Sequence, residues 1–251
     1  MRKIIPFSVL LLLVVATVPS YGAITFVNSC TGGSATGNTF TTAACDMTGV
    51  NLLVACSTSN FAAGGEGAIS DSSTNAWSAG EGIIHGGGTT ITRVSYVAVP
   101  TVTAAQTFTM TCTDCRPSVT VLGFSGALAV SPYDQHNDGE NTASTIQYTT
   151  MTPSEDNEVI VACLGDTAET NVPTINGGFS SPVGQQFVSG QHQGGYGAYL
   201  IQTTAAANTA TWSNVTGDIA TVNTIVQASF KAAAVVAGGG SGGLLLMGVG
   251  Q

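Results

Sequence analysis

Apolar and polar residues alternate in short runs along most of the chain after residue 23. The clearest run is 106–112, where threonines at 107, 109 and 111 alternate with Phe108, Met110 and Cys112. Such alternation predicts an antiparallel β-strand with one buried and one solvated face. In 224–231 the same pattern would turn Val226, Ala228 and Phe230 inward. The pattern therefore predicts an all-β fold.

Turn residues separate these runs at the spacing expected for short strands. Helix-forming residues are scarce, whereas threonine, valine, isoleucine and glycine are abundant. The expected strands are residues 24–29, 51–57, 91–99, 106–112, 119–125, 158–164, 185–189, 197–203, 209–213 and 224–231, with a hairpin over 69–78 that carries Trp77 on its return. Residues 131–141, rich in turn formers, are expected to form a loop.

Two of these runs are alike. Residues 51–56 read NLLVAC and residues 157–163 read NEVIVAC, with one extra residue in the second. The likeness has two interpretations, which are equivalent strands in two halves of the chain and shared strand chemistry alone. We favour shared strand chemistry.

Six short motifs carry a resemblance. They are ITFV at 24–27, NLLV at 51–54, SDSSTNAW at 70–77, FSG at 124–126, NEVIVA at 157–162 and IVQASFK at 225–231. In this order they resemble the landmarks of a diffuse group of exported and phage-associated β-sandwich proteins. The resemblance implies a jelly-roll or immunoglobulin-like sandwich and a role in surface or particle structure and adhesion, and it supplies no catalytic residue.

The two ends of the chain differ from the rest. Arg2 and Lys3 precede an apolar run over 4–18, and Pro19, Ser20 and Gly22 follow it. This layout predicts a signal peptide over 1–22, since the run is short for a membrane-spanning helix. The sandwich domain is expected over 23–231. Residues 232–251 are expected to form a Gly-rich flexible tail with an apolar tip at 244–247, which is either disordered, as we favour, or docks on a sheet edge.

Charge narrows the possible partners. Charged residues make up only 8% of the chain, and acidic residues outnumber basic ones by 14 to 5. Loss of Arg2 and Lys3 with the signal peptide would leave Arg93, Arg116 and Lys231 as the basic residues. Nothing basic is then clustered to neutralise phosphates, so we expect no nucleic-acid binding. Uncharged hydroxyl and amide groups must cover much of the surface, which suits self-association.

Six cysteines remain in the chain after the predicted cleavage. In an exported protein an even number predicts disulfides. Cys30 and Cys45 flank a Gly/Ser/Thr loop, and we expect them to pair. Cys56 and Cys163 lie on apolar strand faces and either bridge two strands or remain buried thiols. For Cys112 and Cys115 we favour a disulfide across a turn over a redox pair or a zinc site.

Candidate sites for chemistry are few. Asp134, Asp138 and Glu140 form the densest set of oxygen ligands in the expected loop, which makes calcium possible, although their spacing does not complete an EF-hand. The alternative for this loop is a solvated turn, and no other cofactor is expected. Tyr133 is the aromatic residue expected to be exposed there and available to stack on a sugar ring, whereas Trp77 and Trp212 are expected in the core.

Catalytic motifs are absent or accidental. His85, His136 and His192 are isolated in sequence, and the one literal Gly-x-Ser-x-Gly, at 239–243, lies in the terminal glycine run. The leading hypothesis is therefore a non-enzymatic, extracellular or cell-surface protein with a structural or adhesive role on a cell surface or virus-like particle (virion), which self-associates or binds a surface glycan or protein. The alternative is a carbohydrate-binding module that binds its sugar with or without calcium. A hydrolase with an unfamiliar site is the third hypothesis.

Overall fold

The computed structural model describes residues 20–34, 37–61, 67–86, 90–113, 115–141, 145–166, 172–182, 194–213, 215 and 223–235. All regular structure in these residues is β, and every strand pairing is antiparallel. The all-β antiparallel sandwich expected from the alternation is confirmed. Within these ranges no helix is long and apolar enough to cross a membrane.

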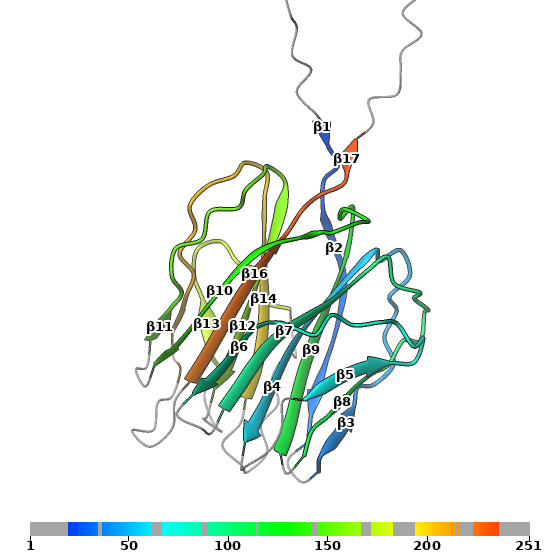
Figure 1. Cartoon of the computed structure of the whole chain (residues 1–251), viewed down its shortest axis with the longest axis vertical. Helices are drawn as coiled ribbons and strands as arrows, with labels where there is room; N and C mark the ends of the chain where they lie inside the picture. The colour runs from blue at the N-terminus through cyan, green and yellow to red at the C-terminus, as the bar shows by residue number, and fades with distance from the viewer. Residues whose placement is uncertain are drawn as a thin grey trace, which may run out of the picture.

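Two main sheets lie at the centre (Figure 1). The first has the strand order β2-β9-β4-β7-β6, with β2 at Thr25–Gly33, β9 at Cys115–Ser125, β4 at Leu52–Phe61, β7 at Thr90–Ala98 and β6 at Glu81–Gly86. The second has the order β10-β16-β12-β14, with β10 at Tyr133–Asn141, β16 at Asn223–Phe230, β12 at Glu158–Asp166 and β14 at Gly194–Gln202.

A small three-stranded sheet covers the outer side of each main sheet. β3 at Thr39–Thr41, β8 at Phe108–Thr111 and β5 at Ala68–Asp71 cover the first in the order β3-β8-β5. β11 at Thr145–Gln147, β15 at Thr211–Ser213 and β13 at Thr174–Ile175 cover the second in the order β11-β15-β13. The described part of the molecule thus has four layers, with β1 (Ser20–Tyr21) and β17 (Ala234–Val235) paired at one end (Figure 1).

Three apolar cores separate the layers. The central core lies between the main sheets and includes Leu52, Val54, Phe124, Val161 and Phe230, all fully buried. The second core, around Leu53, Phe108 and Met110, lies under the first small sheet, and the third, around Tyr148, Leu164 and Trp212, lies under the second. Strands β4 and β12 are therefore buried on both faces, which explains why each contains a continuous apolar run, at 52–56 and 159–164, rather than an alternating one.

Several sequence predictions are confirmed at residue level. In β8, Phe108 and Met110 are buried whereas Thr109 and Thr111 face outward. Val226, Ala228 and Phe230 of β16 belong to the central core as expected. Trp212 is fully buried, and Trp77 packs partly buried against the second core.

Other predictions are wrong. Residues 133–141 form the strand β10 rather than a loop. The expected hairpin over 69–78 has no return strand. The segment after β5 is a turn instead, and the Asp71 carboxylate holds it by accepting hydrogen bonds from the Ser73 amide (2.9 Å) and from Trp77 Nε1 (2.8 Å). The strand expected at 185–189 and the tail beyond 235 lie outside the described residues.

The two halves of the chain repeat one topology. The main-sheet order β2-β9-β4-β7 in the first half matches β10-β16-β12-β14 in the second, and the small-sheet order β3-β8-β5 matches β11-β15-β13. In chain order, β2, β3, β4, β5, β7, β8 and β9 thus correspond to β10–β16. Our preference for shared strand chemistry is therefore wrong, because β4 and β12, which carry the two similar runs, are equivalent strands in two copies of one unit.

Equivalence extends to single residues and irregularities. Phe26 and Tyr133 occupy matching places, each opposite a phenylalanine (Phe124 and Phe230) and each followed by the same register shift. Tyr96 and Tyr199 match as well, because they lie opposite Val54 and Val161. The bridge Cys45–Gln106 has its counterpart in Met151–Asn208.

Matching aromatic residues interlock the copies. Phe26 and Phe124 of the first copy pack with Tyr199 of the second, which stacks on Phe26 at 4.6 Å between ring centroids. Reciprocally, Tyr133 and Phe230 of the second copy pack with Tyr96 of the first, and the two tyrosine rings stack at 6.1 Å. Each copy thus contributes a tyrosine to the other's cluster, as in a two-fold symmetric dimer.

All six cysteines are paired. Cys30 with Cys45, Cys56 with Cys163 and Cys112 with Cys115 have Cα–Cα separations of 6.1, 5.4 and 5.8 Å, within the range for disulfides. The pairings favoured for Cys30–Cys45 and Cys112–Cys115 are confirmed, and for Cys56 and Cys163 the bridge replaces buried thiols. The Cys56–Cys163 bridge joins equivalent residues of the two copies across the central core.

Candidate functional site: a charged cluster on β10, β12 and β16

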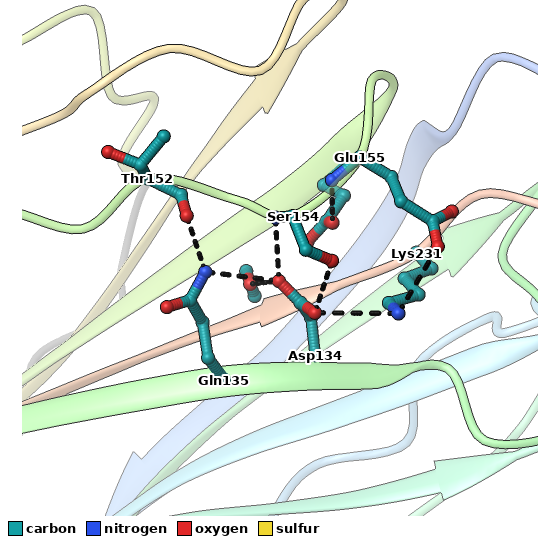
Figure 2. A network of polar contacts seen from close by, with 8 residues as sticks. Asp134, Gln135, Thr152, Ser154, Glu155 and Lys231 are labelled. Atoms are coloured by element: carbon teal, nitrogen blue, oxygen red, sulfur yellow. Dashed lines mark hydrogen bonds and ion pairs between the residues drawn. The ribbon is translucent and has the colours of Figure 1, made fainter.

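Three neighbouring strands of the second main sheet bring charged side chains together at one end. Asp134 lies at the register shift near the start of β10, Glu158 begins β12, and Lys231 directly follows β16. The pairing of Val159 with Phe230 places Glu158 beside Lys231 in register, and the segment 151–157 before β12 contributes Ser154 and Glu155 (Figure 2).

Asp134 is the centre of this charged cluster, which we define as Asp134, Ser154, Glu155, Glu158, Ser229 and Lys231. Its carboxylate accepts hydrogen bonds from the Ser154 amide (2.9 Å), the Ser154 hydroxyl (2.6 Å) and Gln135 Nε2 (3.1 Å). The Ser229 hydroxyl adds a longer bond of 3.3 Å. Burial acts to raise the pKa of Asp134, but these bonds and the Lys231 charge outweigh it and hold the pKa below 3.8.

Lys231 ties the strand to the covering segment. Its Nζ lies 3.4 Å from Asp134 Oδ1 and 3.3 Å from Glu155 Oε1 (Figure 2). The hydrogen bond and the charge of Glu155, together with the charge of Asp134, raise the pKa of Lys231. The ammonium group is therefore a fixed positive charge shared between two carboxylates.

Glu158 is the unusual member of the cluster. Its side chain is fully buried, its Oε1 accepts the Glu155 amide (3.0 Å), and its Oε2 has no hydrogen-bond partner among the described residues. Burial raises the pKa of Glu158 to about 7, and the Asp134 charge acts in the same direction, whereas Ser229, the Glu155 amide and Lys231 oppose the shift without cancelling it. This carboxyl group therefore changes its protonation state near neutral pH.

The first copy has no such cluster at the matching place. Equivalence of Phe26 with Tyr133 and of Phe124 with Phe230 assigns Val27 to the place of Asp134 and Ser125 to that of Lys231. Equivalence of Leu52 with Val159 assigns Asn51 to that of Glu158. Asn51 there makes two neutral hydrogen bonds to the backbone of Ala127. The fold therefore does not require the charges, and they are a feature of the second copy.

The predicted calcium ligands do not converge. Asp134, Asp138 and Glu140 lie along one strand, opposite or near Phe230, Val226 and Thr224 respectively. Strand residues rise by about 3.3 Å each, so the first and last of these carboxylates are separated by roughly 20 Å. Within the described ranges no group of three or more His, Cys, Asp or Glu side chains is arranged to hold a metal ion. The predicted three-residue calcium site is therefore wrong, and its carboxylates instead lie along the edge strand β10.

Tyr133 is not the exposed aromatic residue that the expected loop implied. It is half-buried on β10, belongs to the aromatic cluster with Tyr96 and Phe230, and contacts His136 Nδ1 through its hydroxyl. Burial raises its pKa to about 12, helped by the charge of Glu81. Stacking on Tyr96 covers one face of the ring, so Tyr133 is part of the packing between the copies as well as of the surface.

Sequence reasoning missed Glu158 and Lys231 as site residues. The side-chain pattern predicts strands at both positions and no chemical role, and it associates Asp134 with its neighbours along the chain rather than with its neighbours across the sheet. The one available signal was the acidic residue inside the otherwise apolar run NEVIVAC, where the first copy has none. His85 lies on β6, whereas His192 and residues 239–243 lie outside the described residues.

What the charged cluster can do is fasten the segment 151–157 to three strands and respond to protons through Glu158. No protein-family model, curated protein or solved structure matches the chain.

Proposed function

We propose that this is an exported, non-enzymatic structural protein of a cell surface or virus-like particle, which assembles with further copies of itself through its outer faces. The observation that carries the proposal is the chemistry of those faces. Thr39, Thr41, Thr109, Thr111 and Ser70 point outward from β3, β8 and β5, opposite the side that packs on the core. None of these side chains is charged or large.

The second small sheet presents the same chemistry. Outward positions on β11, β15 and β13 carry Thr145, Gln147, Thr211, Ser213 and Thr174. The described molecule therefore has two broad uncharged faces of hydroxyl and amide groups, one on each outer layer. An acidic chain repels its own copies wherever charged surfaces meet, so uncharged faces are where copies can approach.

Rigidity supports the same role. Three disulfides, two of which lie within the first copy and one of which joins the copies, fit an oxidising extracellular environment. Threonine side chains on the outer faces hydrogen-bond across strands, for example Thr41 with Thr109 at 2.8 Å. This bonding fixes their rotamers before any partner is bound, which lowers the entropy lost on association.

Introducing charged side chains on the two outer faces tests the proposal. The oxidised mature protein is measured by size-exclusion chromatography with light scattering, together with variants carrying Thr41→Lys plus Thr111→Lys on one face or Gln147→Lys plus Thr174→Lys on the other. We expect discrete multimers for the wild type and smaller species for each variant. Thr203→Lys plus Thr204→Lys, which adds the same charge at exposed positions on neither face, serves as the control.

Two results would count against the proposal. One is a wild-type protein that stays monomeric at every concentration reached, and the other is multimers that the control disrupts as strongly as the face variants. Export is tested separately, by N-terminal sequencing of the secreted protein and by mapping disulfides without reductant. Retention inside the cell with free thiols would contradict the extracellular location.

A further inference from the structure

The charged cluster contains a buried acid that the fold does not need. Glu158 is fully enclosed by β16, by β14 through its register partner Gln202, and by the segment 151–157. The charged groups that face it are Asp134 from β10, Glu155 from the covering segment and Lys231 after β16. The neutral Asn51 fills the equivalent place in the first copy, which provides an internal reference for the same fold without the acid.

We propose that Glu158 is a protonation switch: its neutral form fastens the segment 151–157 over the end of β10, β12 and β16, and its ionised form releases that segment to water. Glu158 lies outside both assembly faces, so the test of the switch does not depend on the outcome of the test of self-assembly. The proton is the ligand, and the responding element is the covering segment.

The direction follows from the contacts. Neutral Glu158 can remain buried at little electrostatic cost. The hydrogen bond from the Glu155 amide to its Oε1 favours the ionised form, but burial and the Asp134 charge outweigh this bond. Ionised Glu158 would place a second negative charge beside Asp134 with one oxygen unpaired, and Lys231 is already shared between Asp134 and Glu155. An unpaired buried charge is relieved when water reaches it. Water can enter most easily where the cover is a short segment rather than a paired strand.

The size of the response is bounded by the shift in the pKa of Glu158. A change from 4.5 to about 7 corresponds to a ratio of about 300 between the opening equilibria of the ionised and protonated forms. About fourfold of this ratio has already developed at pH 5, so we expect the segment 151–157 to become up to about 75-fold more open between pH 5 and pH 9, with half of the final opening reached near pH 7.

Hydrogen exchange on the oxidised full-length protein tests the response. Amide exchange at Ser154 and Glu155 is measured from pH 5 to pH 9 and divided by the intrinsic chemical rate at each pH. We expect protection to fall through a midpoint near 7 in the wild type and to be independent of pH in Glu158→Gln. The control Glu140→Gln, which removes an exposed glutamate at the other end of β10 and leaves the charged cluster intact, should retain the transition. A transition that persists unchanged in Glu158→Gln would overturn the proposal.

A measurement on the wild type alone guards against a variant that fails to fold. Carboxyl carbons of glutamate are labelled with ¹³C, and their shifts are followed by NMR over the same pH range. One glutamate should titrate near 7, well above the ordinary value of about 4.3 for this side chain. If every resolved glutamate titrates below about 5.5, the switch is excluded whatever the variants do.

Discussion

At the scale of single residues, glycine decides how closely the main sheets approach. Gly165 of β12 and Gly195 of β14 face threonine and serine side chains of the first sheet, and a Cβ atom on either would collide with them. The space left by Gly165 admits the hydroxyl of Thr92, which hydrogen-bonds to Thr224 at 2.6 Å across the two sheets. Polar side chains thus pack at this end of the central core because small residues oppose them.

This packing predicts the effect of a single methyl group. Gly165→Ala would bring its Cβ into contact with Thr92 Oγ1 and to 2.8 Å from Thr224 Oγ1, so one sheet has to move. We expect a loss of about 1–3 kcal/mol in the free energy of unfolding, measured by denaturant titration. Gly139→Ala on β10, whose Cβ would lie at an ordinary 3.5 Å from Ile225, should change stability by less than about 0.5 kcal/mol. Equal losses in both variants would contradict the packing argument.

Two carboxyl groups of the charged cluster set opposite pH dependences. The pKa of Glu158 is raised in the folded protein, so its stabilising effect is complete below 4.5 and is lost as pH rises through about 7. The pKa of Asp134 is lowered, so its effect is present above 3.8 and is lost as pH falls through the folded value. We expect the melting temperature to peak between these ranges, near pH 4–5, and to decline towards pH 8. A melting temperature that rises from pH 5 to pH 8 would refute this assignment.

At the scale of elements, the reciprocal aromatic clusters join the two copies. Tyr96 and Tyr199 occupy equivalent places, and each packs on a phenylalanine of the other copy at 5.3 and 5.5 Å between ring centroids. A paired arrangement of this kind predicts that the two rings contribute equally to the free energy of unfolding, because each makes the same contacts between the copies.

Truncation of the two tyrosines measures that equality. Tyr96→Ala and Tyr199→Ala should each lower the free energy of unfolding by about 2–4 kcal/mol, since both rings are only partly buried. Tyr96→Phe and Tyr199→Phe keep the ring and should change stability by less than about 1 kcal/mol. Denaturant titration of the four variants decides the matter, and a silent Tyr199→Ala beside a damaging Tyr96→Ala would show that the clusters are not equivalent.

Strands were predictable where side-chain pattern alone decides them. In β8 and β16 every second residue is apolar on the side that packs on a core. Phe108 and Phe230 are buried there, as the alternation predicts. β10 was missed because it has few apolar residues: His136, Asp138 and Glu140 are exposed along an edge of the second main sheet. Pairing with β16 makes this segment a strand, and pairing across a sheet cannot be read from local composition.

The same limit hid the charged cluster and the duplication. Asp134, Glu158 and Lys231 are far apart along the chain, and only the register of β10, β16 and β12 brings them together. The two copies share a topology, yet β4 and β12 are the places where their sequences remain visibly alike. The exposed acidic positions of β10 have a use of their own, because charged side chains on an edge strand prevent pairing with other chains.

At the scale of the whole molecule, the disulfides differ in how much chain they enclose. Cys56–Cys163 spans 107 residues, Cys30–Cys45 spans 15 and Cys112–Cys115 spans 3. Chain-entropy estimates give stabilisations of about 4.7, 3 and 2 kcal/mol in that order. The bridge between the copies should therefore matter most.

Pairwise replacement by alanine tests this ranking. We expect Cys56→Ala with Cys163→Ala to lower the free energy of unfolding most, and Cys112→Ala with Cys115→Ala least, as measured by denaturant titration of otherwise oxidised protein. Reduced wild type provides the lower reference. If loss of the Cys112–Cys115 bridge is the most damaging, local fastening of the turn outweighs closure of the long loop.

The covalent link between the copies also bears on force. The described chain enters β2 and continues past β16 at the same end of the molecule (Figure 1), so tension applied to both ends pulls on the strands outside the Cys56–Cys163 loop. About 107 residues, roughly 350–380 Å of extended chain, cannot be drawn out while that bond is intact. A body tethered at this end could be drawn out only over the part of its chain outside the bond, about half of residues 23–235, and the enclosed half would remain shielded until reductant arrives.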